Sequence, residues 1–303
     1  MCAALAALPT LRLRARLLYD GAAYQGVQYQ PNAPTVAGVL QQALSTRLRH
    51  DVKVVPAGRT DTGVHARGQA VHFDVDAERF AADTIDQLQH SVNCLMPEDV
   101  RVAELEAAPE LDEDGRAWHA IYWSTGKLYT YRFYTGRVMD PTRRAFCHHL
   151  RPERGASQFD LEEARIAAQL LVGEHDFASF ANTRANEPAF TDTVRTVRSI
   201  ELHDEGDGFA RAEVHVKGAL YKQVRNMMGL LFEVGRGARG ASEVSDLLAR
   251  RSRVHLPKPA PAHGLTLEQV YYRTGWDGRY DHPLHTDTVG SGGLRTVRRD
   301  DTD

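Results

Sequence analysis

The residues best suited to chemistry lie together at positions 58–66, which read GRTDTGVHA. Asp61 stands two positions after the basic Arg59, with glycines on both sides of the pair. A guanidinium so close in sequence could pair with the carboxylate and keep it ionised at neutral pH. The glycines permit tight turns and close approach of a ligand. The stretch suits an active-site loop, although these residues also fit a hairpin loop with a turn aspartate and a local ion pair.

Metal and cofactor chemistry finds little support in the sequence. Cys2, Cys94 and Cys147 are isolated, and the 14 histidines show neither HxxxH nor HExxH spacing. His148 and His149 are adjacent, which is a poor chelating geometry on a helix or a strand. We find no P-loop or nucleotide-cofactor motif. The sequence therefore predicts no metal and no small-molecule cofactor.

The same composition bears on cellular location. Three scattered thiols do not form a disulfide framework and fit a reducing compartment. No apolar run approaches the roughly 20 residues that span a bilayer. The apolar start of the chain lacks the basic segment of a secretory signal. We expect a cytoplasmic protein without a membrane segment, and the arginine-rich N-terminus leaves an organellar address open.

Charge is unevenly distributed although the net charge is only −3. Residues 11–70 carry eight Lys/Arg and three Asp/Glu, and residues 215–260 carry nine and three. Residues 71–120 carry three Lys/Arg and thirteen Asp/Glu. The two basic segments could form a local positive surface for a nucleic acid. Ordinary solvated faces would explain the same pattern.

Helix and strand signals alternate as βαββαβ in residues 11–108. The expected strands are Arg12–Tyr19, Lys53–Ala57, 71–75 and Val100–Leu105. One helix follows Thr35, and its apolar positions from Val36 to Leu44 have helical spacing. A second helix follows Asp83, which can act as its N-cap.

Residues 115–275 repeat this order. The expected strands are Leu128–Tyr134, Thr196–Leu202, Phe209–Val216 and Leu267–Tyr272. The expected helices follow Asp160, which can form a capping box with Glu163, and cover 224–234, with an inserted helix near Ser242–Leu248. Two such sheets could join or face each other. We predict an α+β fold of two ferredoxin-like βαββαβ halves, whose mainly antiparallel sheets face a central basic cleft. Residues 1–10 form an N-terminal extension, and 277–303 an expected disordered tail.

Six segments carry a family resemblance. The stretch GRTDTGVHA resembles the signature of the TruA family of pseudouridine synthases. Five further segments resemble motifs of this family: Tyr19–Leu44, Asn93–Val100, His175–Phe180, Val224–Gly229 and Ala260–Leu265. They stand in the family's order between Arg12 and Tyr272, and six matches in order are highly specific.

The resemblance implies an isomerase that converts uridine to pseudouridine in the tRNA anticodon stem-loop, at positions 38–40 on its 3′ side. It implies that Asp61 is the catalytic residue and that Arg59 positions Asp61 or the RNA backbone. It implies that Tyr129 stacks on the target base and that Arg225 pairs with Asp61. A homodimer with tRNA lying across both subunits is implied as well. Without the resemblance, Tyr129 would be interpreted as a core aromatic and Arg225 as a solvated helix residue.

Several positions depart from the family pattern. The family usually has tryptophan at Val27, arginine at Ile121 and a serine-alanine pair at Trp123-Ser124. The strand before Tyr129 therefore differs, which leaves open a pseudouridine synthase acting on another RNA site. A second alternative is a noncatalytic RNA-binding protein of the same fold, which loss of Asp61 would support, but Asp61 is present.

Overall fold

The computed structural model describes residues 10–80, 84–109, 111, 115–151, 158–183 and 191–273. Residues 1–9 of the expected extension and the expected tail 277–303 lie outside these ranges. Residue 10 already belongs to the first strand. No helix among the described residues is both long and apolar enough to cross a bilayer.

The first βαββαβ stretch forms the expected elements with shifted boundaries and adds the short helix α2, which the sequence did not predict. In order they are β1 (Thr10–Tyr19), α1 (Val36–Leu48), β2 (Val55–Pro56), β3 (His65–Asp76), α2 (Ala77–Phe80), α3 (Ile85–Leu95) and β4 (Val100–Ala107). Thr35 caps α1 as predicted, because its hydroxyl accepts from the Gly38 amide. The cap of α3 is Thr84, which exchanges two hydrogen bonds with Gln87 in a capping box. The predicted cap, Asp83, was wrong and lies outside the described residues.

The second stretch contains more elements than the sequence predicts. They are β5 (Ser124–Tyr134), β6 (His148–His149), α4 (Leu161–Gln169), β7 (Gly173–Asp176), β8 (Val194–Gly206), β9 (Phe209–Val216), α5 (Gln223–Gly235), α6 (Glu243–Ala249) and β10 (Leu265–Tyr272). Asp160 caps α4 by accepting from the Glu163 amide. Its own amide donates to the Gly235 carbonyl at 2.6 Å, so the reciprocal half of the predicted capping box is replaced.

All strands of the described residues belong to one mixed, mostly antiparallel sheet, which confirms the α+β prediction. The order is β4-β1-β3-β10-β5-β9-β8-β7, with β2 paired to β3 and β6 paired to β5. The prediction of two sheets facing a cleft is wrong, because β10 joins them: it runs parallel to β3 and antiparallel to β5. Joining removes two edges whose amides and carbonyls would otherwise lack partners. Gly68 permits this approach, since a Cβ there would lie 2.2 Å from the Glu268 carbonyl oxygen.

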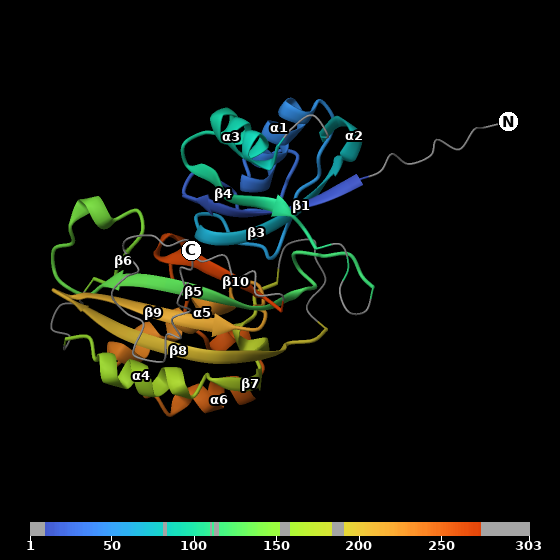
Figure 1. Ribbon diagram of the computed structural model, residues 1–303. Helices are drawn as coiled ribbons and strands as arrows, with labels where there is room; N and C mark the ends of the chain where they lie inside the picture. The colour runs from blue at the N-terminus through green and yellow to red at the C-terminus, as the bar shows by residue number, and fades with distance from the viewer. Residues whose placement is uncertain are drawn as a thin grey trace, which may run out of the picture.

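The two stretches share a strand order. The first stretch has the spatial order β4-β1-β3-β2, and the second has β10-β5-β9-β8. If the strands of each order are numbered along the chain, the fourth lies beside the first, followed by the third and the second, in both stretches. In Figure 1, α1, α2 and α3 lie above the sheet at the top, and α4 and α6 lie below it. Helix α5 is buried along most of its length, including Val224, Met227, Met228, Leu231 and Val234 of the predicted apolar face. Its burial fixes the position of the polar side chains that it also carries.

Candidate active site

Asp61 lies in the loop between β2 and β3, and buried hydrogen bonds hold this loop in place. The Gln69 side-chain amide on β3 donates to the Gly58 carbonyl at 2.9 Å. The hydroxyls of Tyr19 on β1 and Thr60 lie 2.8 Å apart. Each bond is local to the signature stretch or to the strands beside it. These bonds therefore hold the loop in place before any ligand binds, and Asp61 extends from a rigid backbone.

A glycine outside the signature also shapes the loop. Gly26 has φ +87°, a conformation that side chains disfavour. A Cβ at Gly26 would lie 2.6 Å from the Thr60 carbonyl oxygen. The next amide, that of Val27, donates to the same oxygen at 3.3 Å. The segment 26–27 therefore packs directly behind the Asp61 loop, which explains why a motif near residue 26 accompanies the signature.

Asp61 is paired with Arg225 of α5. Arg225 donates to Asp61 Oδ2 at 2.8 Å, and its Nε donates to the Ala260 carbonyl at 2.7 Å. The two side chains are only 13% and 14% exposed. A charge-assisted bond in such a setting is stronger than one in water. The pair therefore holds the carboxylate in one orientation, with its other oxygen available to a ligand.

The remaining motifs position α5. Asn226 donates from its side-chain amide to the Phe180 carbonyl at 2.6 Å and to Asn182 Oδ1 at 2.9 Å. A Cβ at Gly229 would lie 2.4 Å from the Lys258 carbonyl, so that segment packs closely on the helix. The segments 175–180, 224–229 and 260–265 thus meet around Arg225. Their common role in the structure is to present its guanidinium to Asp61.

Tyr129 lies on β5 and is 7% exposed, with its side chain lining the same cavity as Asp61. Burial raises the pKa of its hydroxyl, and nearby Tyr19 and Asp61 raise it further. The hydroxyl makes no hydrogen bond with another residue of the described ranges. It stays protonated at neutral pH and can donate to a ligand, while the ring offers a face.

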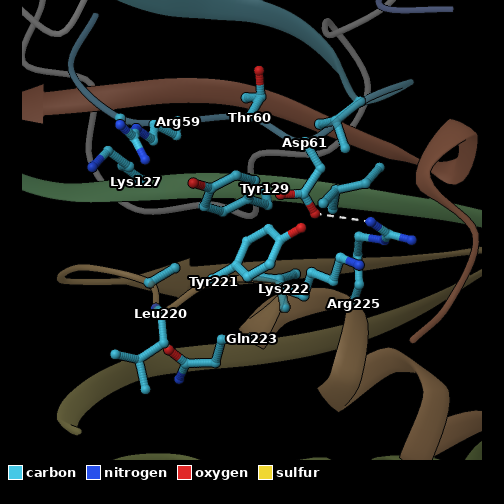
Figure 2. A pocket seen from close by; sticks show the side chains of 15 residues that line it. Arg59, Thr60, Asp61, Lys127, Tyr129, Leu220, Tyr221, Lys222, Gln223 and Arg225 are labelled. Carbon is cyan, nitrogen blue, oxygen red and sulfur yellow. Dashed lines mark hydrogen bonds and ion pairs between the residues drawn. The ribbon is translucent and has the colours of Figure 1, made fainter. Parts of the chain in front are cut away.

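Arg59 is exposed at the mouth of the cavity. Figure 2 places it at the opposite end from Asp61, beside Lys127. The ion pair of Asp61 is therefore made by Arg225 and not by Arg59, the neighbour that the loop sequence alone offered. An exposed guanidinium at a cavity mouth is suited to a phosphate.

The cavity has a volume of about 200 Å³ and lies between the Asp61 loop, β5 and the start of α5. At roughly 30 Å³ for each water molecule, it has room for about six, which is enough for one flat base. Its wall combines a carboxylate, two tyrosine rings and several cations (Figure 2). Within the described ranges, no group of three or more His, Cys, Asp or Glu is placed to hold a metal ion. The arrangement suits nucleophilic chemistry on an aromatic ligand with a negatively charged tail.

Comparisons with known proteins address the identity of this site. A family model described as tRNA pseudouridine synthase matches residues 167–273. The tRNA pseudouridine synthase A of Ruminiclostridium cellulolyticum is 36% identical over 261 residues, or 86% of this chain and 99% of that protein. That of Halalkalibacterium halodurans is 38% identical over 255 residues, or 84% of this chain and 90% of that protein. This chain belongs to the TruA family of tRNA pseudouridine synthases.

The TruA-family assignment makes the chain an isomerase that acts on tRNA, as the sequence predicted. The archaeal box H/ACA sRNP Nop10-Cbf5 structure aligns with 73% of this chain and 44% of that chain. Its TM-score of 0.30 and identity of 12% are too low to support a conclusion.

Positions that depart from the TruA pattern lie away from the cavity wall. Val27 is fully buried behind the Asp61 loop. Ile121 is 44% exposed and, with Trp123, belongs to the turn before β5. None of the three lines the cavity. Their substitution therefore leaves the wall of the TruA-family site intact.

The basic segments of this TruA-family chain are only partly available to RNA. Arg12, Arg14 and Arg16, three of the eight basic residues in 11–70, pair with carboxylates of the acidic segment. These three arginines of β1 therefore add little to a local positive surface, because the neighbouring strands supply acids that pair with them. Charge counted along the sequence cannot show such cross-strand neutralisation.

Sequence reasoning missed several residues of the TruA-family cavity, among them Lys127, Leu220, Tyr221 and Lys222. One signal was available for Lys127. It has the same strand parity as Tyr129, Tyr131 and Phe133, which are all buried. A lysine on a buried, aromatic face of a strand is unusual and therefore indicates a functional role. The short segment 220–222 carries no periodic signal that could have identified it.

Proposed function

We propose that this synthase isomerises uridines at tRNA positions 38–40, on the 3′ side of the anticodon stem-loop, with Asp61 as the nucleophile. The observation that supports this best is the ion pair of Asp61 with Arg225 at a cavity sized for one base. A carboxylate held in one orientation loses little freedom when it attacks. Family membership supports the tRNA substrate, and the choice of uridines rests on the resemblance.

The reaction moves one bond and needs no external reagent. The C1′–N1 bond breaks with its electron pair on the base, the base turns, and C1′ bonds to C5. The C5 proton is lost, and N1 gains a proton. Asp61 can assist by attacking C6 of the uracil or C1′ of the ribose. Both routes use the same carboxylate.

The other residues bind the substrate in this proposal. The target base must leave the stack, at a cost of a few kcal/mol. Tyr129 stacks on the extruded base, and Arg59 at the mouth holds a backbone phosphate. Arg225 keeps Asp61 oriented through the 2.8 Å contact. The exposed position of Arg59 and the buried position of Tyr129 support this division of roles.

The assembly is a further part of the proposal. We interpret 11–108 and 115–275 as two ferredoxin-like halves, because their strand orders match. We infer a homodimer with tRNA across both subunits, acting in the cytoplasm, where tRNA is modified. Elution volume with and without tRNA would test the dimer.

The direct test uses anticodon-arm RNAs that each carry a single uridine at position 38, 39 or 40. Chemical mapping after incubation with the purified protein should show pseudouridine at these positions. A matched RNA with uridine only in the 5′ strand should stay unmodified. Pseudouridine elsewhere in whole tRNA, but not here, would favour another RNA site. Tight binding without any pseudouridine would favour a noncatalytic RNA-binding protein.

A further inference from the structure

Lys127 is an unusual residue in the cavity wall. It lies on β5, two residues before Tyr129 and on the same face of the strand, and it is only 8% exposed. Its side chain lines the cavity. The Lys127 ammonium makes no hydrogen bond or ion pair with another residue of the described part of the chain. A buried ammonium without a partner is costly, so such groups usually serve a ligand.

The neighbouring loop leaves space for this ammonium. A Cβ at Gly58 would lie 2.9 Å from Lys127 Nζ and 3.0 Å from its Cε. Gly58 precedes Asp61 by three residues in the loop that Gln69 holds. The loop that presents the carboxylate thus also fixes where the Lys127 ammonium can lie. Lys127 and Asp61 therefore keep a constant relation to each other.

The two groups bracket Tyr129. Figure 2 shows Lys127 at one end of the cavity and the Asp61–Arg225 pair at the other, with Tyr129 between them. Burial is the main cause of the raised pKa of the Tyr129 hydroxyl, and the charges of Tyr19 and Asp61 raise this pKa further. A ring that stacks on Tyr129 with one edge toward Asp61 therefore has its opposite edge toward Lys127.

A phosphate is a poor match for Lys127. Phosphates of an RNA backbone stay at the protein surface, where the exposed Arg59 can reach them. A side chain that is 8% exposed contacts what enters the cavity, namely the extruded base. In uracil, C4 and its carbonyl oxygen lie across the ring from N1, the atom bonded to the ribose. Asp61 acts at C6 or C1′, both on the ribose side.

We propose that the Lys127 ammonium donates a hydrogen bond to O4 of the target uracil and stabilises the negative charge that forms on the base. This inference rests on the proposed function. When the C1′–N1 bond breaks, its electron pair spreads over N1, O2 and O4. When Asp61 adds to C6 instead, the electron pair displaced from the C5–C6 bond forms an enolate at O4. Lys127 thus stabilises the negative charge on O4 in either route, because its ammonium is already in position before the reaction begins.

The protonation state fits this role. Burial lowers the pKa of Lys127 to about 8, so the ammonium form still predominates at neutral pH. The charged groups that share the cavity are Arg59, Asp61, Lys222 and Arg225. Lys127 has donors and no acceptor, so it also discriminates between bases. Uracil offers an acceptor at C4, whereas cytosine offers an amino group that would oppose the ammonium.

The first experiment compares wild type with Lys127→Met, which keeps the length of the side chain and removes the charge. We expect the single-turnover rate on saturating anticodon-arm RNA to fall about 100-fold or more. RNA affinity should change by less than about threefold, and the melting temperature should rise. An unchanged rate would overturn the proposal. An unchanged saturated rate with weaker, less salt-dependent binding would show a phosphate contact and would also overturn it.

The second experiment needs no turnover. In the Asp61→Asn background, the affinity for an arm RNA with one target uridine is compared with that for the same RNA carrying cytidine. We expect a preference for uridine of about threefold, which Lys127→Met reduces to about one. A ratio that Lys127→Met leaves unchanged would refute the contact with O4. If wild type forms no pseudouridine on any RNA, the proposed function fails, and this ratio still decides the role of Lys127.

Discussion

Lys127→Met should stabilise the folded protein at neutral pH, because it removes a buried charge. Burial lowers the pKa of Lys127 from 10.5 to about 8. One pKa unit corresponds to about 1.4 kcal/mol, so keeping this ammonium charged costs the folded state about 3 kcal/mol. Below pH 8 the full cost is present. Between pH 8 and 10.5 the unfolded chain binds more protons than the folded one, so wild-type stability gains from this group as pH rises.

The assay is urea unfolding of both proteins between pH 7 and pH 10.5. The free-energy advantage of Lys127→Met should shrink by about 3 kcal/mol across this range, since titration of shared groups cancels in the difference. Lys217→Met is the matched control. Lys217 is exposed, so its substitution removes a lysine charge without removing a buried one. A pH-independent advantage for Lys127→Met, or a loss of stability at pH 7, would refute the assignment of an unpaired buried ammonium.

Three further predictions follow from the site. Arg225→Met should destabilise the protein by roughly 3 kcal/mol, because it leaves the Asp61 carboxylate, which is 13% exposed, without its ion-pair partner. Adding Asp61→Asn to this variant should recover stability. If the double variant is no more stable, the pairing is contradicted. Tyr129→Phe should keep RNA affinity, whereas Tyr129→Ala should lose about 1–3 kcal/mol of it. If Tyr129→Ala loses activity only in proportion to stability, the stacking role is wrong. RNA affinity should weaken as the salt concentration rises. The slope of log affinity against log salt should be smaller than all basic residues of 11–70 and 215–260 would give together, because several of them are paired with carboxylates. An affinity that does not change with salt would show that none of these residues contacts RNA.

The local parts of this fold could be predicted from the sequence. The alternation of 71–75 predicted part of β3, and Thr35 predicted the start of α1. The apolar spacing of 224–234 predicted α5 and the burial of its face. Each of these features depends on residues a few positions apart, for which periodicity and capping are direct physical signals.

The long-range parts could not be predicted in the same way. Strand β10 carries no local sign that it pairs with β3 as well as β5, so the single sheet was missed. The Asp61–Arg225 contact spans 164 residues, and only the motif resemblance anticipated it. Lys127 was missed because a lysine on a strand usually faces solvent. Its burial depends on Gly58, which belongs to a different element and comes close only in the folded chain.

The role of Asp61 is tested most directly by mapping pseudouridine formed by Asp61→Asn and by wild type on the same anticodon-arm RNA. An asparagine keeps the shape of the side chain but cannot act as the nucleophile. We expect wild type to modify the target uridine and Asp61→Asn to form no detectable pseudouridine, while Asp61→Asn still folds and keeps an RNA affinity close to that of wild type. Turnover by Asp61→Asn at the wild-type rate would contradict the assignment of Asp61 as the catalytic residue.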